Sequence, residues 1–273
     1  MSTGMIDPTA RIESGATIGR DVSIGPYCTV GPAVTIGDGC RLIGHVHLTG
    51  HTQIGARTVI YPFASLGTPP QSVKYRGGPT RLVIGPDCDI REAVTMNTGT
   101  EDGGGLTQVG EKCFVMVGCH VAHDCKVGSN VTFSNNVTLA GHVTVGDNVV
   151  FGGLSAVLQF TRIGEGAMIA GLSGIRADVI PWAIATGQHA HLAGLNVVGM
   201  RRRGWSKADI HQVRAAYETL FFGSGEFRTR LDRVAAEYGG VPSIAKIIEF
   251  IRMGKGRLTR PHTVSESDTD GEI

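Results

Sequence analysis

The sequence has no excess of charge of either sign, few cysteines and no long apolar run. Lys plus Arg number 25 and Asp plus Glu number 24, so the net charge is +1. Nucleic-acid binding is therefore not expected, because it needs a basic excess to pair with phosphates. Six cysteines in 273 residues are too sparse for a disulfide framework.

Membrane and export signals are also missing. No stretch of about 18 consecutive apolar residues occurs, so no membrane span is expected. The segment from Met1 to Pro8 has neither the basic region nor the apolar region of a secretory signal. These absences predict a cytoplasmic protein.

Glycine is abundant and aromatic residues are scarce. The chain has 40 glycines, 6% aromatic residues and 41% hydrophobic residues. The glycine content is about twice the usual share, but glycine does not recur at every third position, which excludes a collagen helix. The hydrophobic content also argues against a disordered chain. This composition indicates short strands joined by many tight turns.

An apolar residue recurs at every sixth position. One series runs from Ile6 to Leu66, a second from Ile84 to Met96, and a third, one residue out of phase, from Val109 to Ile175. All 26 positions are apolar, and 12 are followed directly by glycine. Period six is the hexapeptide pattern of a parallel β-helix. Glycine suits its corners because it adopts backbone conformations that a Cβ obstructs.

The predicted fold is a left-handed parallel β-helix with a C-terminal α-helical domain. Known hexapeptide helices place three hexads in each coil and wind left-handed, so 26 hexads predict eight to nine coils. The hand follows from this likeness, since ordinary crossovers are right-handed. All six cysteines stand four residues after a repeat position and are predicted to be small, buried fillers. They are Cys28, Cys40, Cys88, Cys113, Cys119 and Cys125.

The predicted β-helix occupies residues 1–181, with excursions at 72–83 and 102–108. Loops that leave a regular scaffold often carry function. The second excursion, although rich in glycine, lacks the Lys and Ser/Thr of a phosphate-binding loop. Residues 182–261 are predicted to be helical, and 262–273 to be a disordered tail. The expected helices are Lys207–Phe222, capped by Ser206, then Glu226–Tyr238 and Ser243–Met253.

Coil stacking predicts one cluster of reactive side chains. Residues 18 apart lie about 5 Å apart on adjacent coils, which places Asp124 beside His142. His120 and His123 belong to the same stretch. An imidazole with a carboxylate partner is a typical general base near neutral pH. There are two alternatives for these residues. They could be solvated histidines on a polar face, which is the state expected of His45, His47 and His51, or they could form a zinc site. The histidine spacings of 3 and 19 match the zinc sites of hexapeptide helices poorly.

From residue 5 to about 260, the chain resembles the bacterial UDP-N-acetylglucosamine O-acyltransferases of lipid A biosynthesis. A hexad repeat alone is shared by many acyltransferases, so the resemblance depends on specific stretches and on both excursions. The stretches are Gly25-Pro26, Val30-Gly31-Pro32, Lys74-Tyr75, Pro79-Thr80-Arg81, Gly103-Gly104-Gly105-Leu106-Thr107, Ala122-His123-Asp124-Cys125, Leu139-Ala140-Gly141-His142, Gln159-Phe160, Gly194-Leu195-Asn196 and Arg201-Arg202-Arg203-Gly204.

The resemblance implies transfer of an (R)-3-hydroxyacyl group from acyl carrier protein to the 3-hydroxyl of a UDP-sugar. It implies that His123 is the general base, that Asp124 orients His123, and that the Gly141 amide stabilises the oxyanion. It implies neither a metal nor a cofactor, because the donor is the phosphopantetheine thioester of the carrier protein. It also implies a homotrimer with sites between neighbouring chains.

The resemblance also implies the substrate-binding residues. Gln71, Lys74, His120 and His142 would lie around the sugar. Gln159, Asn196, Arg202 and Arg203 would lie on the nucleotide side, where paired arginines suit a diphosphate. A solvated helix end is the alternative for the two arginines. Gly171 would set the acyl length and favour 12 to 14 carbons, unless it is only a turn glycine of the repeat.

The sequence departs from the family at four places. Ser72 replaces a common Asp, Asn97-Thr98 replaces His-Arg, Leu158 replaces His and Val198 replaces Glu. Each change removes a polar or charged contact expected near the nucleotide-sugar. The alternative substrate is therefore a UDP-3-amino-3-deoxy analogue, which would be N-acylated. A non-catalytic binding solenoid is the alternative from a different class.

Overall fold

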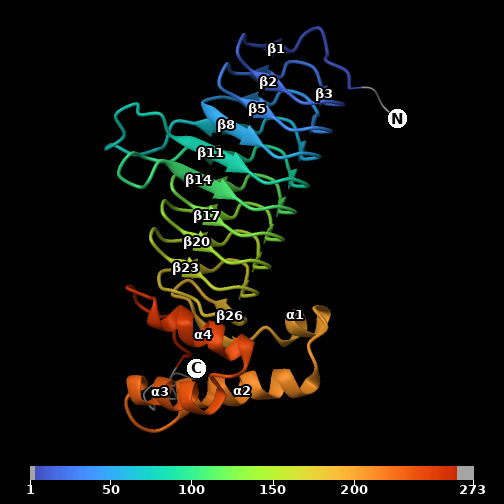
Figure 1. The fold of residues 1–273 in the computed structure, drawn as a ribbon. Helices are drawn as coiled ribbons and strands as arrows, with labels where there is room; N and C mark the ends of the chain where they lie inside the picture. Colours follow the sequence, from blue (N-terminus) through green and yellow to red (C-terminus); the bar gives the residue numbers. More distant parts are fainter. Residues whose placement is uncertain (1–3, 263–273) are drawn as a thin grey trace, which may run out of the picture.

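A computed structural model describes residues 4–262 of the chain. Short strands form three sheets of nine, eight and ten strands, all parallel except for β27, and from β1 to β25 neighbouring strands differ by three in chain order. Each coil thus contributes one strand to each sheet, and the coils stack as a left-handed parallel β-helix, as predicted. Figure 1 shows the column of coils, with helices gathered below its C-terminal end.

The strands of the three sheets are very short, most of them two residues long. The first sheet contains β1 (Arg11–Ile12), β4 (Thr29–Val30), β7 (His47–Leu48), β10 (Ser65–Thr68), β13 (Thr95–Asn97), β16 (His120–Val121), β19 (Thr138–Leu139), β22 (Ala156–Val157) and β25 (Gly174–Ile175). The second contains β2 (Thr17–Ile18), β5 (Thr35–Ile36), β8 (His51–Ile54), β11 (Arg81–Ile84), β14 (Leu106–Val109), β17 (Lys126–Val127), β20 (Thr144–Val145) and β23 (Arg162–Ile163). The third contains β3 (Ser23–Ile24), β6 (Arg41–Leu42), β9 (Val59–Ile60), β12 (Asp89–Ile90), β15 (Phe114–Val115), β18 (Thr132–Phe133), β21 (Val150–Phe151), β24 (Met168–Ile169), β26 (Ala183–Thr186) and β27 (His191–Leu195).

The period-six residues and the strands coincide. Each strand from β1 to β25 contains one residue of the repeat, and the remaining one, Ile6, forms an isolated bridge with Ile24. The register is the predicted 18 residues in regular coils, as where Val121 pairs with Leu139. Because every coil places its repeat residue over that of the coil before, the aliphatic side chains form continuous ladders inside the helix.

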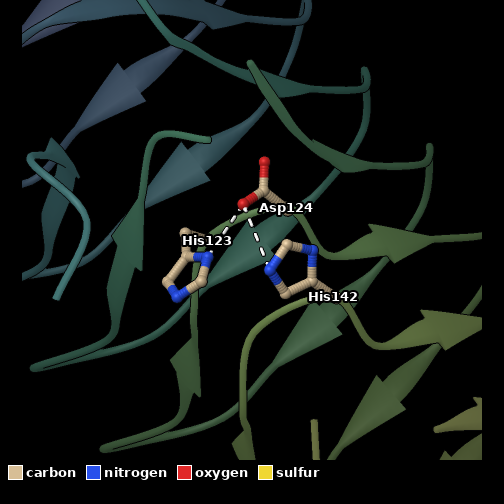
Figure 2. A group of neighbouring side chains, drawn as sticks. All are labelled: His123, Asp124 and His142. Atoms are coloured by element: carbon tan, nitrogen blue, oxygen red, sulfur yellow. Dashed lines mark hydrogen bonds and ion pairs between the residues drawn. The ribbon is translucent and has the colours of Figure 1, made fainter. Parts of the chain in front are cut away.

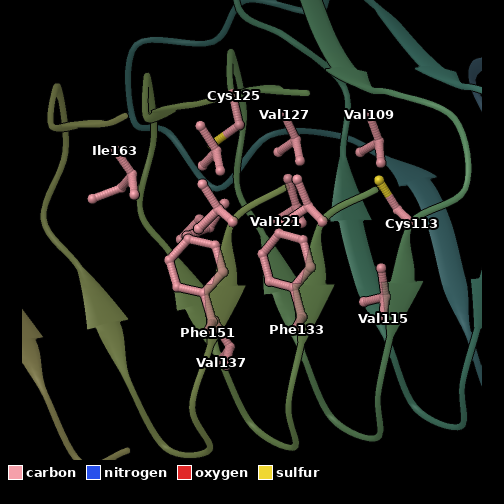
Figure 3. Close-up of a cluster of buried hydrophobic side chains, with 14 of the residues drawn as sticks. Val109, Cys113, Val115, Val121, Cys125, Val127, Phe133, Val137, Phe151 and Ile163 are labelled. Atoms are coloured by element: carbon pink, nitrogen blue, oxygen red, sulfur yellow. The ribbon is translucent and has the colours of Figure 1, made fainter. Parts of the chain in front are cut away.

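The interior of the β-helix is a narrow apolar core. Figure 3 shows Phe133 and Phe151 side by side on adjacent coils, and their stacked rings have centroids 5.0 Å apart. All six cysteines are buried and unpaired, as predicted. Burial disfavours the thiolate and raises the pKa of Cys125 to about 12. The cysteines therefore fill space in the core, where all six are closed off from solvent.

Both excursions begin and end a few residues earlier in the chain than predicted. The first lies between β10 and β11, so it comprises residues 69–80, and the second lies between β13 and β14, so it comprises 98–105. The predicted bounds 72–83 and 102–108 are wrong, because Arg81–Ile84 pairs along its length with Leu106–Val109. Each excursion therefore leads into a four-residue strand that ties it to the coils (Figure 1).

Sheet structure continues beyond residue 181, where a helical domain was predicted to begin. Strand β26 pairs in parallel with β24, and β27 returns antiparallel to β26. The prediction is wrong for Ala183–Leu195 because the sixfold period ends there while the open edge of β24 still accepts a strand. The hairpin thus closes one sheet at this end.

Four helices follow the hairpin: α1 (Val197–Arg202), α2 (Lys207–Phe222), α3 (Phe227–Tyr238) and α4 (Pro242–Arg252). Helix α2 has the predicted bounds, α3 begins one residue later than predicted, α4 begins and ends one residue earlier, and α1 was not predicted. The side chains of Ser206 and Asp209 form a capping box at the start of α2. No helix within residues 4–262 is long and apolar enough to cross a membrane. The predicted tail lies outside the described residues, except for His262.

Candidate active site

One corner of the β-helix brings the predicted reactive side chains together. Asp124 and His142 occupy the same turn position on adjacent coils and both have left-handed backbone conformations, with φ of 61° and 62°. The His142 N–H donates to the His123 carbonyl at 3.0 Å, which fixes the two coils in register. Figure 2 shows His123 and His142 on either side of the Asp124 carboxylate. The predicted stacking of Asp124 with His142 is confirmed.

His123 and Asp124 form a hydrogen-bonded pair. The distance from His123 Nδ1 to Asp124 Oδ2 is 2.8 Å, and that from His142 Nε2 to the same oxygen is 3.8 Å. The Asp124 side chain is 1% exposed, whereas that of His123 is 15% exposed. An ionised carboxylate only accepts hydrogen bonds, so the proton of this pair lies on His123 Nδ1. His123 Nε2 then keeps its lone pair, which is the state required of a general base.

Asp124 is held by residues at both ends of the second excursion. Thr100 donates to the carboxylate through its backbone N–H, at 2.9 Å from Oδ1, and its hydroxyl, at 2.6 Å from Oδ2. The Asp124 N–H donates to the Thr107 hydroxyl at 2.8 Å. A buried carboxylate is costly unless it is paired and hydrogen-bonded. These contacts satisfy that requirement and also fix the plane of the carboxylate.

Gly141 lies against the His123 ring. A Cβ at this position would be 2.5 Å from His123 Cε1 and 2.8 Å from Nε2, so only glycine leaves the ring in place. Within residues 4–262, the Gly141 N–H donates to no protein acceptor. A backbone donor beside a general base is the arrangement that stabilises a developing oxyanion.

Two further histidines surround the pair. The His142 ring stacks on Phe160 at 4.4 Å and meets the His123 ring edge-on at 5.1 Å. Burial lowers the pKa of His142, Asp124 opposes this effect, and His123 adds to it. Burial also lowers the pKa of His120, whose Nδ1 lies 2.8 Å from the Thr95 hydroxyl. Both rings are therefore mainly neutral at neutral pH and suit hydrogen bonding rather than ion pairing.

His123, Asp124 and His142 are also the residues whose geometry could hold a metal ion. Among the described residues, they form the one group of at least three His, Cys, Asp or Glu side chains with ligand atoms within 4.8 Å of one another. The Asp124 oxygen in this group, Oδ2, already accepts hydrogen bonds from His123 and Thr100. The prediction of no metal stays a prediction.

Known proteins with the same architecture match nearly the whole chain. Residues 178–259 match the family described as Udp N-acetylglucosamine O-acyltransferase, Domain 2, and residues 15–46 and 106–141 match the Bacterial transferase hexapeptide (six repeats). The acyl-[acyl-carrier-protein]–UDP-N-acetylglucosamine O-acyltransferase of Azorhizobium caulinodans is 58% identical over 94% of this chain and 95% of its own length. The chain belongs to that family of acyltransferases.

Solved structures agree with this membership. The UDP-N-acetylglucosamine O-acyltransferase of Moraxella catarrhalis superposes with a TM-score of 0.90 at 42% identity, covering 93% of this chain and 99% of that one. The UDP-N-acetylglucosamine acyltransferase of Arabidopsis gives a TM-score of 0.83 at 33% identity, covering 94% and 100%. The fold predicted from the repeat and the enzyme class implied by the resemblance are therefore those of this acyltransferase family.

Several predicted substrate residues of this acyltransferase lie on its surface, away from local partners. Gln71, Lys74, Gln159 and Arg202 are exposed. None of their side chains makes a hydrogen bond or ion pair within residues 4–262. Lys74 and Gln71 belong to the first excursion, and Arg202 ends α1. Within residues 4–262, no hydrogen bond or ion pair joins any of these four side chains to His123, and their substrate roles stay predictions.

Asn196 and Arg203 have structural contacts that the sequence did not reveal. Asn196 is 6% exposed; its Oδ1 caps α1 by accepting from the Gly199 N–H at 3.0 Å, and its Nδ2 donates to the Gly166 carbonyl at 2.9 Å. Arg203 donates to the Asn148 carbonyl at 2.7 Å. These contacts use one hydrogen of Nδ2 and one lone pair of Oδ1, so the side chain has a structural role, and its contact with a nucleotide stays a prediction.

Gly171 does not need to be glycine for its backbone conformation. The left-handed corner of that coil is taken by Leu172, with φ of 58°. A Cβ on Gly171 would meet only backbone atoms of Gly153, the nearer at 3.2 Å. Gly171 is exposed. The alternative that it is only a turn glycine therefore loses its main physical reason.

The replaced family residues occupy different environments. Asn97 is 2% exposed and donates to the Thr68 hydroxyl at 2.8 Å, while the Thr98 hydroxyl accepts from that of Thr80 at 3.0 Å. These two residues therefore connect the start of the second excursion to the two ends of the first. Leu158 and Val198 are 49% and 58% exposed, and Ser72 is half-buried.

The 18-residue spacing between adjacent coils did not predict four residues of the site. They are Thr100, Gly103, Thr107 and Phe160. Thr100 meets Asp124 across 24 residues, not 18, because the second excursion lengthens its coil. Phe160 stands 18 residues after His142, and the same arithmetic could have found it.

Proposed function

We propose that this protein transfers an (R)-3-hydroxyacyl group from acyl carrier protein to the 3-hydroxyl of UDP-N-acetylglucosamine, in lipid A biosynthesis. The observation that carries the proposal is the buried Asp124 carboxylate bonded to His123, with Gly141 packed against the His123 ring. The family membership supports the same reaction, since the relatives are named acyl-[acyl-carrier-protein]–UDP-N-acetylglucosamine O-acyltransferases.

The reaction proceeds by direct attack of the sugar on the thioester. The sugar oxygen forms a bond to the acyl carbonyl carbon while His123 Nε2 removes the hydroxyl proton. The Gly141 N–H donates to the resulting oxyanion, a contribution of about 3 to 4 kcal/mol for a single such donor. The carbon–sulfur bond then breaks, and His123 returns the proton to the carrier protein's thiolate. Asp124 keeps His123 oriented and stabilises its positive charge between these steps.

A homotrimer would complete the site. One corner column of the β-helix carries exposed apolar side chains: Tyr27, Phe63, Leu154 and Leu172 are between 59% and 66% exposed. Tyr27 and Phe63 sandwich His45, with centroids 5.0 and 5.2 Å from it. Exposed apolar surface of this kind favours contact with another chain. Gly171, next to Leu172, would then border the groove that holds the acyl chain.

The two alternatives receive less support. N-acylation of a 3-amino sugar is not favoured, because the relatives are named O-acyltransferases. A non-catalytic solenoid does not account for a His–Asp pair with a buried carboxylate and a glycine packed against the imidazole. The carrier protein and the UDP-sugar are the proposed partners, and a cytoplasmic location stays a prediction.

Mass spectrometry of the product tests the proposal directly. Purified protein is incubated with UDP-N-acetylglucosamine or its 3-amino analogue and with carrier-protein thioesters of 10 to 14 carbons. We expect an O-acylated product from the natural sugar without an added metal or cofactor. His123→Ala protein is the control. Acylation of the amino sugar alone would replace the O-acyl proposal, and no acylation by the folded protein would refute both.

A further inference from the structure

We propose that Thr100 is a positioning residue of this acyltransferase, which holds the Asp124 carboxylate and through it the base His123. The inference rests on the proposed function and extends it to the second excursion. Thr100 is 5% exposed and lies just after β13, where the chain leaves the β-helix.

Thr100 contacts both oxygens of one carboxylate. Its N–H lies 2.9 Å from Asp124 Oδ1, and its Oγ1 lies 2.6 Å from Oδ2. Two bonds from one residue to two oxygens prevent the carboxylate from rotating about its own axis. Since Oδ2 is also the oxygen that accepts from His123 Nδ1, the direction of the imidazole depends on this clamp.

The direction of the Thr100 hydroxyl bond is settled by its neighbours. The Gly103 N–H donates to the same Oγ1 at 3.1 Å, so that oxygen already acts as an acceptor. An ionised carboxylate has no proton to give, which leaves the Thr100 hydroxyl as the donor to Asp124. Such charge-assisted bonds are short and about twice as strong as neutral ones.

The second excursion is shaped around this clamp. The Thr100 carbonyl accepts from the N–H groups of Gly103 and Gly105, at 3.2 and 2.8 Å, which folds the loop into a tight turn. A Cβ on Gly103 would lie 2.1 to 2.4 Å from the Asp124 carboxyl atoms, so the loop backbone covers the carboxylate directly. The glycines of the second excursion, Gly103 to Gly105, thus allow the backbone to close over the Asp–His pair.

This arrangement matters for the rate because His123 becomes positively charged during the reaction. The carboxylate must face the imidazole as that charge develops, and small misplacements of catalytic groups reduce rates strongly. Removing the Thr100 hydroxyl leaves Thr100 bonded to the carboxylate only through its N–H at Oδ1, so Oδ2 can move relative to His123, while the substrate contacts stay intact. The loss should therefore fall on kcat rather than KM.

Three substitutions separate the hydroxyl from the shape of the residue. We expect Thr100→Val, which keeps the shape, to lower kcat by about tenfold or more with KM for UDP-N-acetylglucosamine within about twofold. Thr100→Ser, which keeps the hydroxyl, should retain kcat within about threefold. Thr58→Val is the matched control, because Thr58 is also fully buried and its hydroxyl donates to the Gly85 carbonyl in the core. Equal loss in Thr100→Val and Thr100→Ser, or none in Thr100→Val, would overturn the inference.

A double-mutant cycle tests whether Thr100 acts through Asp124. In an Asp124→Ala background, Thr100→Val should cause no further loss of kcat, because the group it positions is gone. A full additional tenfold loss there would show an independent role and overturn the proposal. If Thr100→Val does not fold, Thr100→Ala replaces it in both experiments.

The wild-type protein separates this inference from the function itself. Wild-type protein that fails to acylate UDP-N-acetylglucosamine refutes the proposed function, whatever the variants do. Active wild-type protein with an unaffected Thr100→Val variant refutes only the role of Thr100.

Discussion

At the scale of single residues, the site depends on a few side chains at one corner. Asp124 is buried and fully used by protein contacts, while His123 keeps one nitrogen for chemistry. Left-handed backbone at Asp124 and His142 turns both side chains outward from the core. The proposed catalytic pair thus lies at an ordinary corner of the repeat and replaces no apolar side chain of the core.

His123→Ala should remove most of the activity without unfolding the protein. Loss of a general base lowers rates by about 10²- to 10⁴-fold. The side chain is outside the core, so the melting temperature should change little. Rates from product mass spectrometry and melting by circular dichroism check both statements. A folded His123→Ala protein with wild-type activity would contradict the assignment.

Gly141→Ala should also be nearly inactive while folded. The added methyl group would lie 2.5 to 3.1 Å from three atoms of the His123 ring and would displace the base. We expect kcat to fall by about 100-fold, as when a general base is lost. Gly153→Ala is the comparison, since a Cβ there has no neighbour closer than 3.3 Å. Equal rates for the two variants would show that the position of the ring is not limiting.

Gly171→Met should shorten the preferred acyl chain. Gly171 is exposed and does not have a left-handed conformation, so the backbone accepts a side chain with a small shift. Each methylene excluded from the groove loses about 0.8 kcal/mol of burial, so the preference between donors should change by about tenfold or more for two carbons. Parallel rates with 10-, 12- and 14-carbon donors on wild type and variant measure it. An unchanged profile would remove Gly171 from chain-length selection.

At the scale of elements, the two excursions are joined to each other. The Glu101 carboxylate accepts from the N–H groups of Gly78 and Arg76, at 2.7 and 3.2 Å. Its own backbone N–H and those of Gly78 and Arg76 hold the pKa of Glu101 below its usual value, so the group is ionised at neutral pH. The first excursion, which carries Gln71 and Lys74, is thereby tied to the loop that holds Asp124.

Glu101→Ala should therefore weaken substrate binding more than the chemical step. Without the carboxylate, the first excursion loses its hydrogen bonds to the second. Part of the free energy of substrate binding is then used to order the first excursion. We expect KM for UDP-N-acetylglucosamine to rise about threefold, with kcat within about twofold. Glu111→Ala, which removes a partly buried acid paired with Lys112, is the control. A change in kcat alone would show that the link serves the base rather than the substrate.

At the scale of the whole molecule, the β-helix has an apolar corner and a polar reactive corner. Coil stacking produces both, since each corner is a column of residues repeated at every coil. The corner with Tyr27, Phe63, Leu154 and Leu172 is exposed in the single chain. Such a column suits a threefold arrangement of chains, in which substrate side chains without local partners meet the neighbouring His123.

Light scattering should find a homotrimer, and Leu154→Lys should dissociate it. The new charge would be buried in the interface without a partner, which is costly. Activity should fall together with the trimer fraction, because in the proposed trimer each site takes residues from a neighbouring chain. Met253→Lys, which changes an exposed apolar residue outside this column, is the control. A stable, fully active monomer would refute both the trimer and the shared site.

The period of six by itself determined the β-helix, its strands, the buried cysteines and the stacking of Asp124 on His142. Such a repeat is local: each coil meets only its neighbours, so spacing along the chain converts directly into position. The ends of helix α2 were equally local, because its capping box lies in four consecutive residues.

Only the tertiary structure decided what breaks this period. The second excursion lengthens one coil, so Thr100 reaches Asp124 from 24 residues away, and no regular spacing indicates that contact. Likewise, β26 pairs with the open edge of β24, and the Asn196 side-chain amide donates to the Gly166 carbonyl, 30 residues away. Backbone and buried polar groups need hydrogen-bond partners, and these contacts supply them. Which partner is near enough depends on the folded chain and not on any sequence pattern.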